Sequence, residues 1–296
     1  MKKQIALSLP ILSGLLLSAC GENDDTINFG TQQYTDPKIL AHIVEGIVED
    51  RTEYNVEITK DINASPQVIT SLEQGEFDIA TLYSGEVYNN HFDGVEFTTD
   101  AEETFRQAQE GFEEHFNFTW YDKIGYTNNY VLAVNENVAN EHNPEQIEDL
   151  EAYADQLNLG TDNTWLEREG DGYRDFQETY DFSFNDERGM NVRLMYEAVE
   201  NDELDVVTGH SVDPQIIELN MKTLEDNKDF FPSFEGAFVA NNDMVEEYPE
   251  VDEILQELQD SIDTETMTEL IYEVDLEGRS EEEVAYEWLE KNGWLD

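Results

Sequence analysis

The sequence has one cysteine among its 296 residues, and its 15 lysines and arginines stand against 70 aspartates and glutamates. A single cysteine excludes an intrachain disulfide. The formal net charge of −55 repels nucleic acid and anionic membrane surfaces, so neither is expected as a partner. The motifs G-x-S-x-G and H-E-x-x-H and a glycine-rich phosphate loop are absent, and the five histidines show no metal-ligand spacing. We therefore expect no enzyme, no cofactor and no metal site.

Long apolar runs are also scarce, and the one that exists covers residues 5–17. It is shorter than the roughly 20 residues of a membrane-spanning helix. Lys2 and Lys3 precede it and small residues follow it, which is the pattern of a secretory signal. The segment LSAC that closes it resembles a bacterial lipobox, which predicts a signal peptide over 1–19 and lipid attachment at Cys20. We expect an extracytoplasmic protein held to the bacterial cell membrane by its lipid alone. A plain signal peptide with an incidental cysteine is the alternative.

The aromatic content is high for so acidic a chain, with 4 Trp, 14 Tyr and 15 Phe. An acidic disordered chain carries few aromatic residues, so this composition indicates a folded protein. The acidic residues are spread along the whole sequence. We interpret them as a solvated surface suited to high external salt, where screening shortens the range of self-repulsion to a few ångströms.

Apolar segments of strand length alternate with helical patterns in the first part of the chain. Strands are expected at 26–32, 54–62 and 77–85, and helices at 36–50, 65–76 and 100–116. This alternation predicts a parallel sheet with right-handed crossovers.

A second alternating run begins at 129–136. It continues with a helix after Pro144, a strand at 157–162, helices near 173–180 and 188–201, and a strand at 205–211. A strand at 236–241 and acidic helices at 249–260, 263–273 and 280–292 follow. No Pro/Gly/Ser linker separates two halves, so we expect two α/β lobes joined by two chain crossings. Lobe 1 is expected to comprise 20–127 plus 236–296, and lobe 2 to comprise 128–235.

Two segments carry a resemblance to a known family: LGTDNTWLEREGDGYRDFQETYDFSF at 159–184 and IDTETMTELIYEVD at 262–275. They resemble segments of the substrate-binding lipoproteins of quaternary-ammonium (glycine betaine, choline, carnitine) ABC importers, the ProX/OpuBC/OpuCC type. Shorter matches follow in the expected order: GTQQYTD (30–36), DIATLYSGE (78–86), WYDKIGYTNNY (120–130) and FFPSFEG (230–236). The resemblance implies a two-lobe type II periplasmic-binding-protein fold with the ligand in the interlobe cleft, and delivery to an ABC permease.

The family resemblance also implies an aromatic cage for the ligand's cationic head. A trimethylammonium group has no N–H donor, but aromatic faces attract it through cation–π interactions. The family uses four tyrosines, and the matching positions here are Tyr83, Tyr130, His210 and Phe234. Phenylalanine retains a π-face. A neutral imidazole can stack on a cation, whereas an imidazolium would repel it, so His210 makes the site sensitive to pH.

Three further positions are implied by the same resemblance. Gln32 matches a cleft position that contacts the ligand's polar tail, and Asn128 lies near the hinge crossing. Glu86 occupies a position where relatives carry threonine or aspartate and where betaine-type and choline-type specificity divide. A carboxylate there repels a ligand carboxylate and accepts a hydrogen bond from a ligand hydroxyl. We therefore expect a neutral, choline-like tail.

Other functions stay open at this point. The altered cage is compatible with another cationic or zwitterionic solute, and a surface sensor that is not coupled to transport would have the same sequence features. An extracellular enzyme acting on such compounds would need a nucleophile or a metal. The binding protein is expected to act as a monomer.

Overall fold

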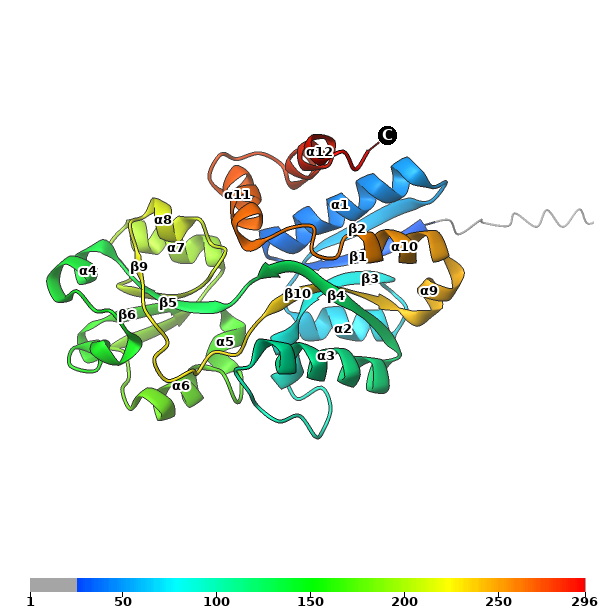
Figure 1. Ribbon diagram of the computed structural model, residues 1–296. Coiled ribbons are helices and arrows are strands. Elements are labelled where there is room, and N and C mark those ends of the chain that lie inside the picture. Colours follow the sequence, from blue (N-terminus) through cyan, green and yellow to red (C-terminus); the bar gives the residue numbers. More distant parts are fainter. Residues whose placement is uncertain (1–25, 296) are drawn as a thin grey trace, which may run out of the picture.

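Residues 26–295 are described by a computed structural model (Figure 1). The expected signal peptide and the lipid attachment site at Cys20 lie outside this range. None of the helices between residues 26 and 295 is both long and apolar enough to cross a membrane.

The first of two five-stranded sheets has the strand order β2-β1-β3-β10-β4. Its strands are β1 (Thr26–Gln32), β2 (Asn55–Ile62), β3 (Ile79–Tyr83), β4 (Phe118–Thr127) and β10 (Glu235–Asn241). β1 pairs in parallel with β2 and β3, as the alternation of strands and helices predicts. β10 is antiparallel to both of its neighbours, because the chain enters it from the other half of the molecule.

Helices cover both faces of this sheet (Figure 1). They are α1 (Thr35–Arg51), α2 (Ser65–Glu73), the 3-10 helix η1 (Ser84–Tyr88), α3 (Ala101–Phe116), α9 (Asn242–Glu247), α10 (Pro249–Glu257), α11 (Thr264–Asp275) and α12 (Glu281–Asn292). α1 lies between the sheet and the C-terminal helices, and its Ile39, Ile43 and Ile47 are fully buried. Burying such a side chain contributes about 1.5–3 kcal/mol, so this helix anchors the C-terminal segment to the first sheet.

The second sheet has the strand order β7-β6-β8-β5-β9. Its strands are β5 (Tyr130–Val134), β6 (Asn158–Thr161), β7 (Asp186–Gly189), β8 (Val206–His210) and β9 (Lys222–Thr223). The helices around it are α4 (Glu136–His142), η2 (Ile147–Leu150), η3 (Ala154–Gln156), α5 (Asn163–Glu167), α6 (Tyr173–Tyr180), α7 (Val192–Glu200) and α8 (Gln215–Glu218).

Two chain segments connect the halves, one between β4 and β5 and the other between β9 and β10 (Figure 1). They are hydrogen-bonded to each other: the Asn128 amide donates to the Phe234 carbonyl at 2.8 Å, and the Phe234 amide donates to Asn129 Oδ1 at 2.8 Å. The chain therefore crosses from one sheet to the other twice at a single place.

Two helix predictions differ from the structure, and some elements, such as β4, were not predicted. The helix expected from 188 begins only at Val192, because Asp186–Gly189 forms the edge strand β7. That strand is charged and half-exposed, so it has no apolar alternation to reveal it. The helix expected after Pro144 is the short 3-10 helix η2, and β4 was not predicted as a strand.

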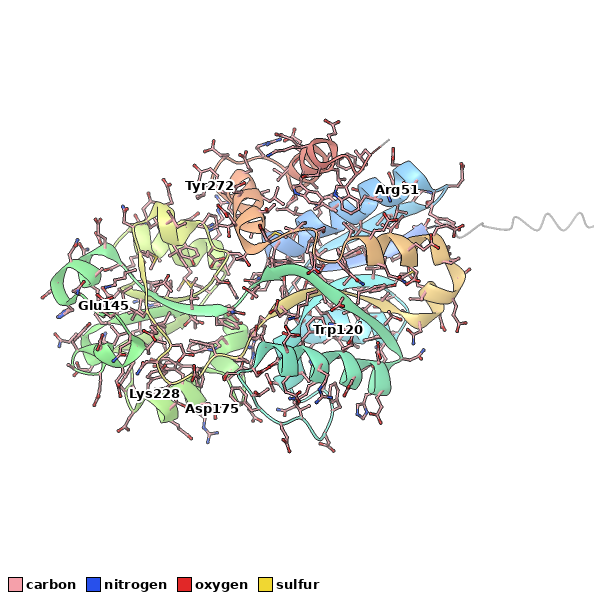
Figure 2. The ribbon with its side chains drawn as sticks, viewed as in Figure 1. Arg51, Trp120, Glu145, Asp175, Lys228 and Tyr272 are labelled. Carbon is pink, nitrogen blue, oxygen red and sulfur yellow. The ribbon has the colours of Figure 1, made fainter. Side chains whose placement is uncertain are left out.

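Carboxylates dominate the surface, and the few basic side chains lie beside them (Figure 2). Arg51 pairs with Glu257 at 2.6 Å, and Lys228 lies 3.4 Å from Glu148. Exposed pairs of this kind contribute at most about 1 kcal/mol each. The fold is therefore stabilised by its buried apolar side chains, such as Trp120, and not by surface ion pairs.

Candidate functional site

The register of the strands brings four predicted residues together where the two sheets meet. Tyr130 begins β5 and is paired directly with His210, which ends β8. Tyr83 ends β3 and is paired with Gly236 of β10, two residues after Phe234. Three of these side chains therefore lie at strand ends, and Phe234 lies in the crossing segment directly before β10.

The rings of Tyr130, His210 and Phe234 form one cluster, whereas the Tyr83 ring packs edge-on against Tyr126. The Tyr130 ring centroid lies 4.8 Å from that of His210 and 5.4 Å from that of Phe234, with the Phe234 ring nearly perpendicular. Gly85 makes room for Phe234, because a Cβ atom at position 85 would lie 2.5 Å from the phenyl ring. The glycine in LYSGE is thus needed for close approach of the ring.

These side chains line a cavity of about 40 Å³, which has room for a few water molecules. Six of the seven predicted ligand residues line it: Tyr83, Glu86, Asn128, Tyr130, His210 and Phe234. Two larger cavities, of about 630 and 510 Å³, share several of its lining residues.

A fifth ring, which the sequence analysis did not identify, is Tyr34. It lies immediately before α1, and its ring centroid is 5.3 Å from that of His210 in an edge-on arrangement. Burial raises the pKa of the Tyr34, Tyr83 and Tyr130 hydroxyls well above the usual range, so all three remain protonated. The sequence feature that could have identified Tyr34 is its place in the segment GTQQYTD, two residues after the predicted Gln32.

Buried carboxylates accept hydrogen bonds from two of the cage tyrosines. The Tyr83 hydroxyl donates to Asp36 at 2.5 Å, and the Tyr130 hydroxyl donates to Asp162 at 3.2 Å. Asp36 also accepts from Tyr126 at 2.9 Å. Burial raises the pKa of Asp36, and the hydrogen bonds from Tyr83 and Tyr126 oppose that rise. The net pKa of Asp36 stays raised, and when ionised these carboxylates place negative charge behind the rings, which favours a cation in front of them.

An arginine also reaches the cage, and sequence analysis did not identify it. The Arg168 guanidinium carbon lies 5.2 Å from the Tyr130 ring centroid and 5.8 Å from that of Phe234, which is cation–π distance. Arg168 donates to Asp171 at 3.0 Å and to the Tyr130 hydroxyl at 3.1 Å. Its Nε is buried and has no hydrogen-bond partner. The ion pair with Asp171 holds this side chain at the wall of the cavity.

Glu86 is buried with 5% of its surface exposed, and it lines the same cavity. Its Oε2 accepts a hydrogen bond from Asn89 Nδ2 at 2.6 Å and lies 3.9 Å from His91 Nε2. Burial raises the pKa of Glu86, but the interaction with His91 and the charge of Arg168 bring it below its usual value. Glu86 is therefore an ionised acceptor at neutral pH and not the surface charge that its acidic context would suggest.

Gln32 lies behind the cavity and does not line it. It is fully buried, and its amide donates to the Thr81 carbonyl at 3.0 Å. Asn128 does line the cavity, and its Nδ2 donates to Asp36 at 3.0 Å. Asn128 therefore connects the crossing segment to the carboxylate behind Tyr83.

His210 is the most electrostatically distinctive member of the cage. Burial lowers its pKa, but the nearby Asp213 carboxylate, together with the charges of Asp162 and Asp36, raises it above the usual histidine value. Its Nδ1 lies 3.7 Å from Asp213 Oδ2. Among the described residues, no group of three or more His, Cys, Asp or Glu side chains has an arrangement that could hold a metal ion.

Comparison with known proteins identifies related chains. Residues 25–291 match the family model described as the substrate-binding domain of ABC-type glycine betaine transport systems. The chain is 34% identical to the carnitine transport binding protein OpuCC of Listeria monocytogenes, over all of this chain and 98% of that protein. A crystal structure of a glycine betaine/carnitine/choline ABC transporter protein is 28% identical with a TM-score of 0.75, and covers 91% of this chain and all of that one. A choline-binding protein in complex with choline shares the fold, with a TM-score of 0.68 at 19% identity, over 92% of this chain and 90% of that one.

Proposed function

Since this chain belongs to the family of substrate-binding domains of ABC-type glycine betaine transport systems, we propose that its cage captures a quaternary ammonium solute for delivery to the permease. As a member of that family it is an extracytoplasmic substrate-binding component and not an enzyme. The relatives are named for carnitine, choline or glycine betaine, so these three solutes are the candidates. Two lobes, 20–127 plus 236–296 and 128–235, would close over the ligand.

The observation that carries this proposal is a cluster of aromatic rings backed by negative charge. The ligand's head would lie against Tyr83, Tyr130, His210 and Phe234, with Tyr34 as a fifth wall. Each desolvated aromatic face contributes about 0.5–2 kcal/mol to binding a cation. Asp36 and Asp162 behind the tyrosines add attraction that a neutral ligand would not experience.

The tail of the ligand would lie toward Glu86 and Arg168. Arg168 is already paired with Asp171, and the Glu86 carboxylate is a negatively charged acceptor at this end of the cavity. A ligand hydroxyl can donate to Glu86, whereas a ligand carboxylate is repelled. We therefore favour a choline-like ligand over glycine betaine.

One observation supports a second candidate. Arg168 Nε is buried without a partner, and a ligand acceptor placed there would satisfy it. A solute with both a hydroxyl and an acceptor in its tail, such as carnitine, would use Glu86 and Arg168 together. A wider zwitterionic solute, or sensing without transport, would use the same cleft.

The remaining parts of the proposal concern the chain's surroundings. Cys20 would carry the lipid that tethers the mature chain to the bacterial membrane, and the protein would work as a monomer. Mass spectrometry of the mature N-terminus would detect a diacylglyceryl group on Cys20. An unmodified Cys20, or cleavage at another site, would disprove the lipid anchor without affecting the proposed ligand.

Calorimetric titration of the mature chain tests the proposed ligand, with choline, glycine betaine, carnitine and tetramethylammonium at low and high salt. Tetramethylammonium is the head group alone and reports on the cage without the tail. Binding also raises the melting temperature, because stabilisation grows as RT ln(1 + [L]/Kd). We expect choline to bind more tightly than glycine betaine. If none of the four ligands binds or stabilises the protein, the proposed function is wrong.

A further inference from the structure

A histidine outside the cavity lies directly behind Glu86. His91 follows η1 in the loop 89–100, and its side chain is 10% exposed. Its ring packs against α3, with centroids 5.4 Å from Phe112 and 6.3 Å from Phe116. His91 does not line the cavity, whereas Glu86 and Asn89 do. Glu86 is thus held between the ligand cavity in front and the histidine behind.

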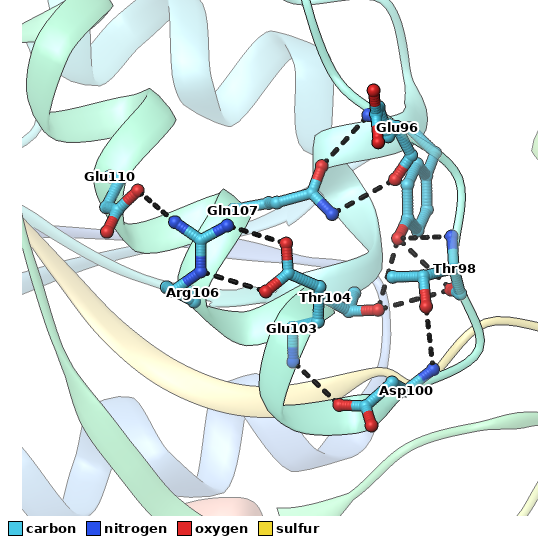
Figure 3. A network of polar contacts seen from close by, with 9 residues as sticks. Glu96, Thr98, Asp100, Glu103, Thr104, Arg106, Gln107 and Glu110 are labelled. Carbon is cyan, nitrogen blue, oxygen red and sulfur yellow. Dashed lines mark hydrogen bonds and ion pairs between the residues drawn. The ribbon is translucent and has the colours of Figure 1, made fainter.

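The loop that carries His91 is tied to α3 at its far end (Figure 3). The Glu96 amide donates to Gln107 Oε1, and Gln107 Nε2 donates back to the Glu96 carbonyl, both at 3.0 Å. The Tyr88 hydroxyl lies 3.1 Å from Thr104 Oγ1 before the loop begins. Both ends of the segment are therefore anchored on the same helix, which fixes the position of the imidazole.

The ring nitrogen Nε2 of His91 faces the Glu86 carboxylate. His91 Nε2 is buried and has no hydrogen-bond partner within normal distance, and it lies 3.9 Å from Glu86 Oε2. Asn89 donates to that same oxygen at 2.6 Å. A buried polar nitrogen without a partner is destabilising, so this arrangement needs an explanation.

We propose that His91 is a positioning residue for ligand selectivity: its imidazole packs behind the Glu86 oxygen that Asn89 holds, and so keeps the carboxylate turned toward a hydroxyl in the ligand's tail. The inference rests on the proposed function, because it concerns the tail end of the same cavity. A carboxylate that accepts from Asn89 and faces the imidazole keeps its charge and repels a ligand carboxylate. Without the histidine, Glu86 can rotate or take up a proton, and a protonated Glu86 can donate to a ligand carboxylate.

The test compares Kd ratios in variants of the mature chain, using choline, glycine betaine and tetramethylammonium as probes. His91→Phe preserves the ring that packs on Phe112 but removes the donor, and His91→Gln retains a donor. We expect His91→Phe to lower the ratio of the betaine Kd to the choline Kd about tenfold, and Glu86→Gln to lower it at least as much. His91→Gln should retain most of the wild-type ratio. His142→Phe, the same substitution in α4 of the other half, where the ring stacks on Tyr153, is the matched control and should change neither Kd.

Tetramethylammonium separates the possible outcomes. Its Kd should be unchanged in the histidine variants, because it has no tail. If Glu86→Gln changes the ratio and His91→Phe does not, this inference is wrong and the proposed function stands. If His91→Phe weakens tetramethylammonium and choline equally, His91 supports the fold and not selectivity. His91→Leu provides a second donor-free variant if His91→Phe does not fold. A wild-type protein that binds none of the probes refutes the proposed function and this inference with it.

Discussion

Lowering the pH should weaken ligand binding through His210. The protonated imidazole is stabilised by Asp213, Asp162 and Asp36, which hold the pKa of His210 above the usual histidine value. The same ring is one wall of the cage, 4.8 Å from Tyr130. A quaternary ammonium ion and the His210 proton therefore compete for the same negative surroundings, and binding near neutral pH should release a proton.

The size of the effect follows from Coulomb's law. Two unit charges about 5 Å apart repel by roughly 3 kcal/mol at an effective dielectric constant of 20, which corresponds to about a hundredfold in Kd. The nearby carboxylates attract both cations, but they do not remove this mutual repulsion. We expect Kd to rise by at most about tenfold per pH unit below the His210 pKa, and to level off after a total rise of about ten- to a hundredfold.

Titration of tetramethylammonium between pH 5.5 and 8.5 measures this effect, because the probe has no group that titrates. Repeating the titration in buffers of different ionisation enthalpy counts the released protons. His210→Tyr should bind with little pH dependence and release none. Equal pH dependence in wild type and His210→Tyr would refute the reasoning. The ligand-free protein should show the opposite trend: the raised pKa stabilises the fold below about pH 6.5, and this contribution is lost as pH rises through the folded-state pKa.

Three further substitutions test the structure around the cage. Asp36→Asn should weaken tetramethylammonium and choline about tenfold alike in calorimetric titrations, because it removes charge behind Tyr83; an effect on choline alone would contradict this. Gly85→Ala should raise the Kd of both ligands about tenfold, since the new Cβ displaces Phe234; unchanged affinity would show that this ring is not part of the cage. Gln215→Ala removes a 2.9 Å hydrogen bond from Gln215 in α8 to Asp275 in α11. We expect the Kd of every ligand to rise about threefold. X-ray scattering should show that the ligand-free variant is more open than the wild type.

The broad fold could be predicted because apolar periodicity marks its buried elements. The strand at 26–32 and the helix expected at 36–50 are almost fully buried, and their patterns gave bounds close to the observed ones. The edge strand Asp186–Gly189 could not be found in this way, since its side chains are charged and half-exposed. Local sequence patterns also cannot predict that β10 is antiparallel, because its direction depends on where the chain returns from the second sheet.

The cage was predicted in part, through family resemblance and not through residue chemistry alone. Tyr83, Tyr130, His210 and Phe234 meet although they are far apart in sequence, because strand register brings them together. Arg168 was missed because an arginine in an acidic helical segment looks like an ordinary surface residue. Only the three-dimensional structure reveals that its guanidinium lies over two aromatic rings.

The segment 33–36 contacts both halves of the molecule beside the cage. Each of its residues makes a different contact, and the partners are Asn191 for Gln33, His210 for Tyr34, Asp275 for Thr35, and Tyr83 for Asp36. Asn191 and His210 belong to the second half, whereas Asp275 and Tyr83 belong to the first. Because cage rings come from both sheets, a bound cation gains its full set of contacts only when the halves are together. If the halves close over the ligand as proposed, a ligand would shift the equilibrium toward closure by that difference in affinity, and the residues that build the cage would also set how completely the protein closes.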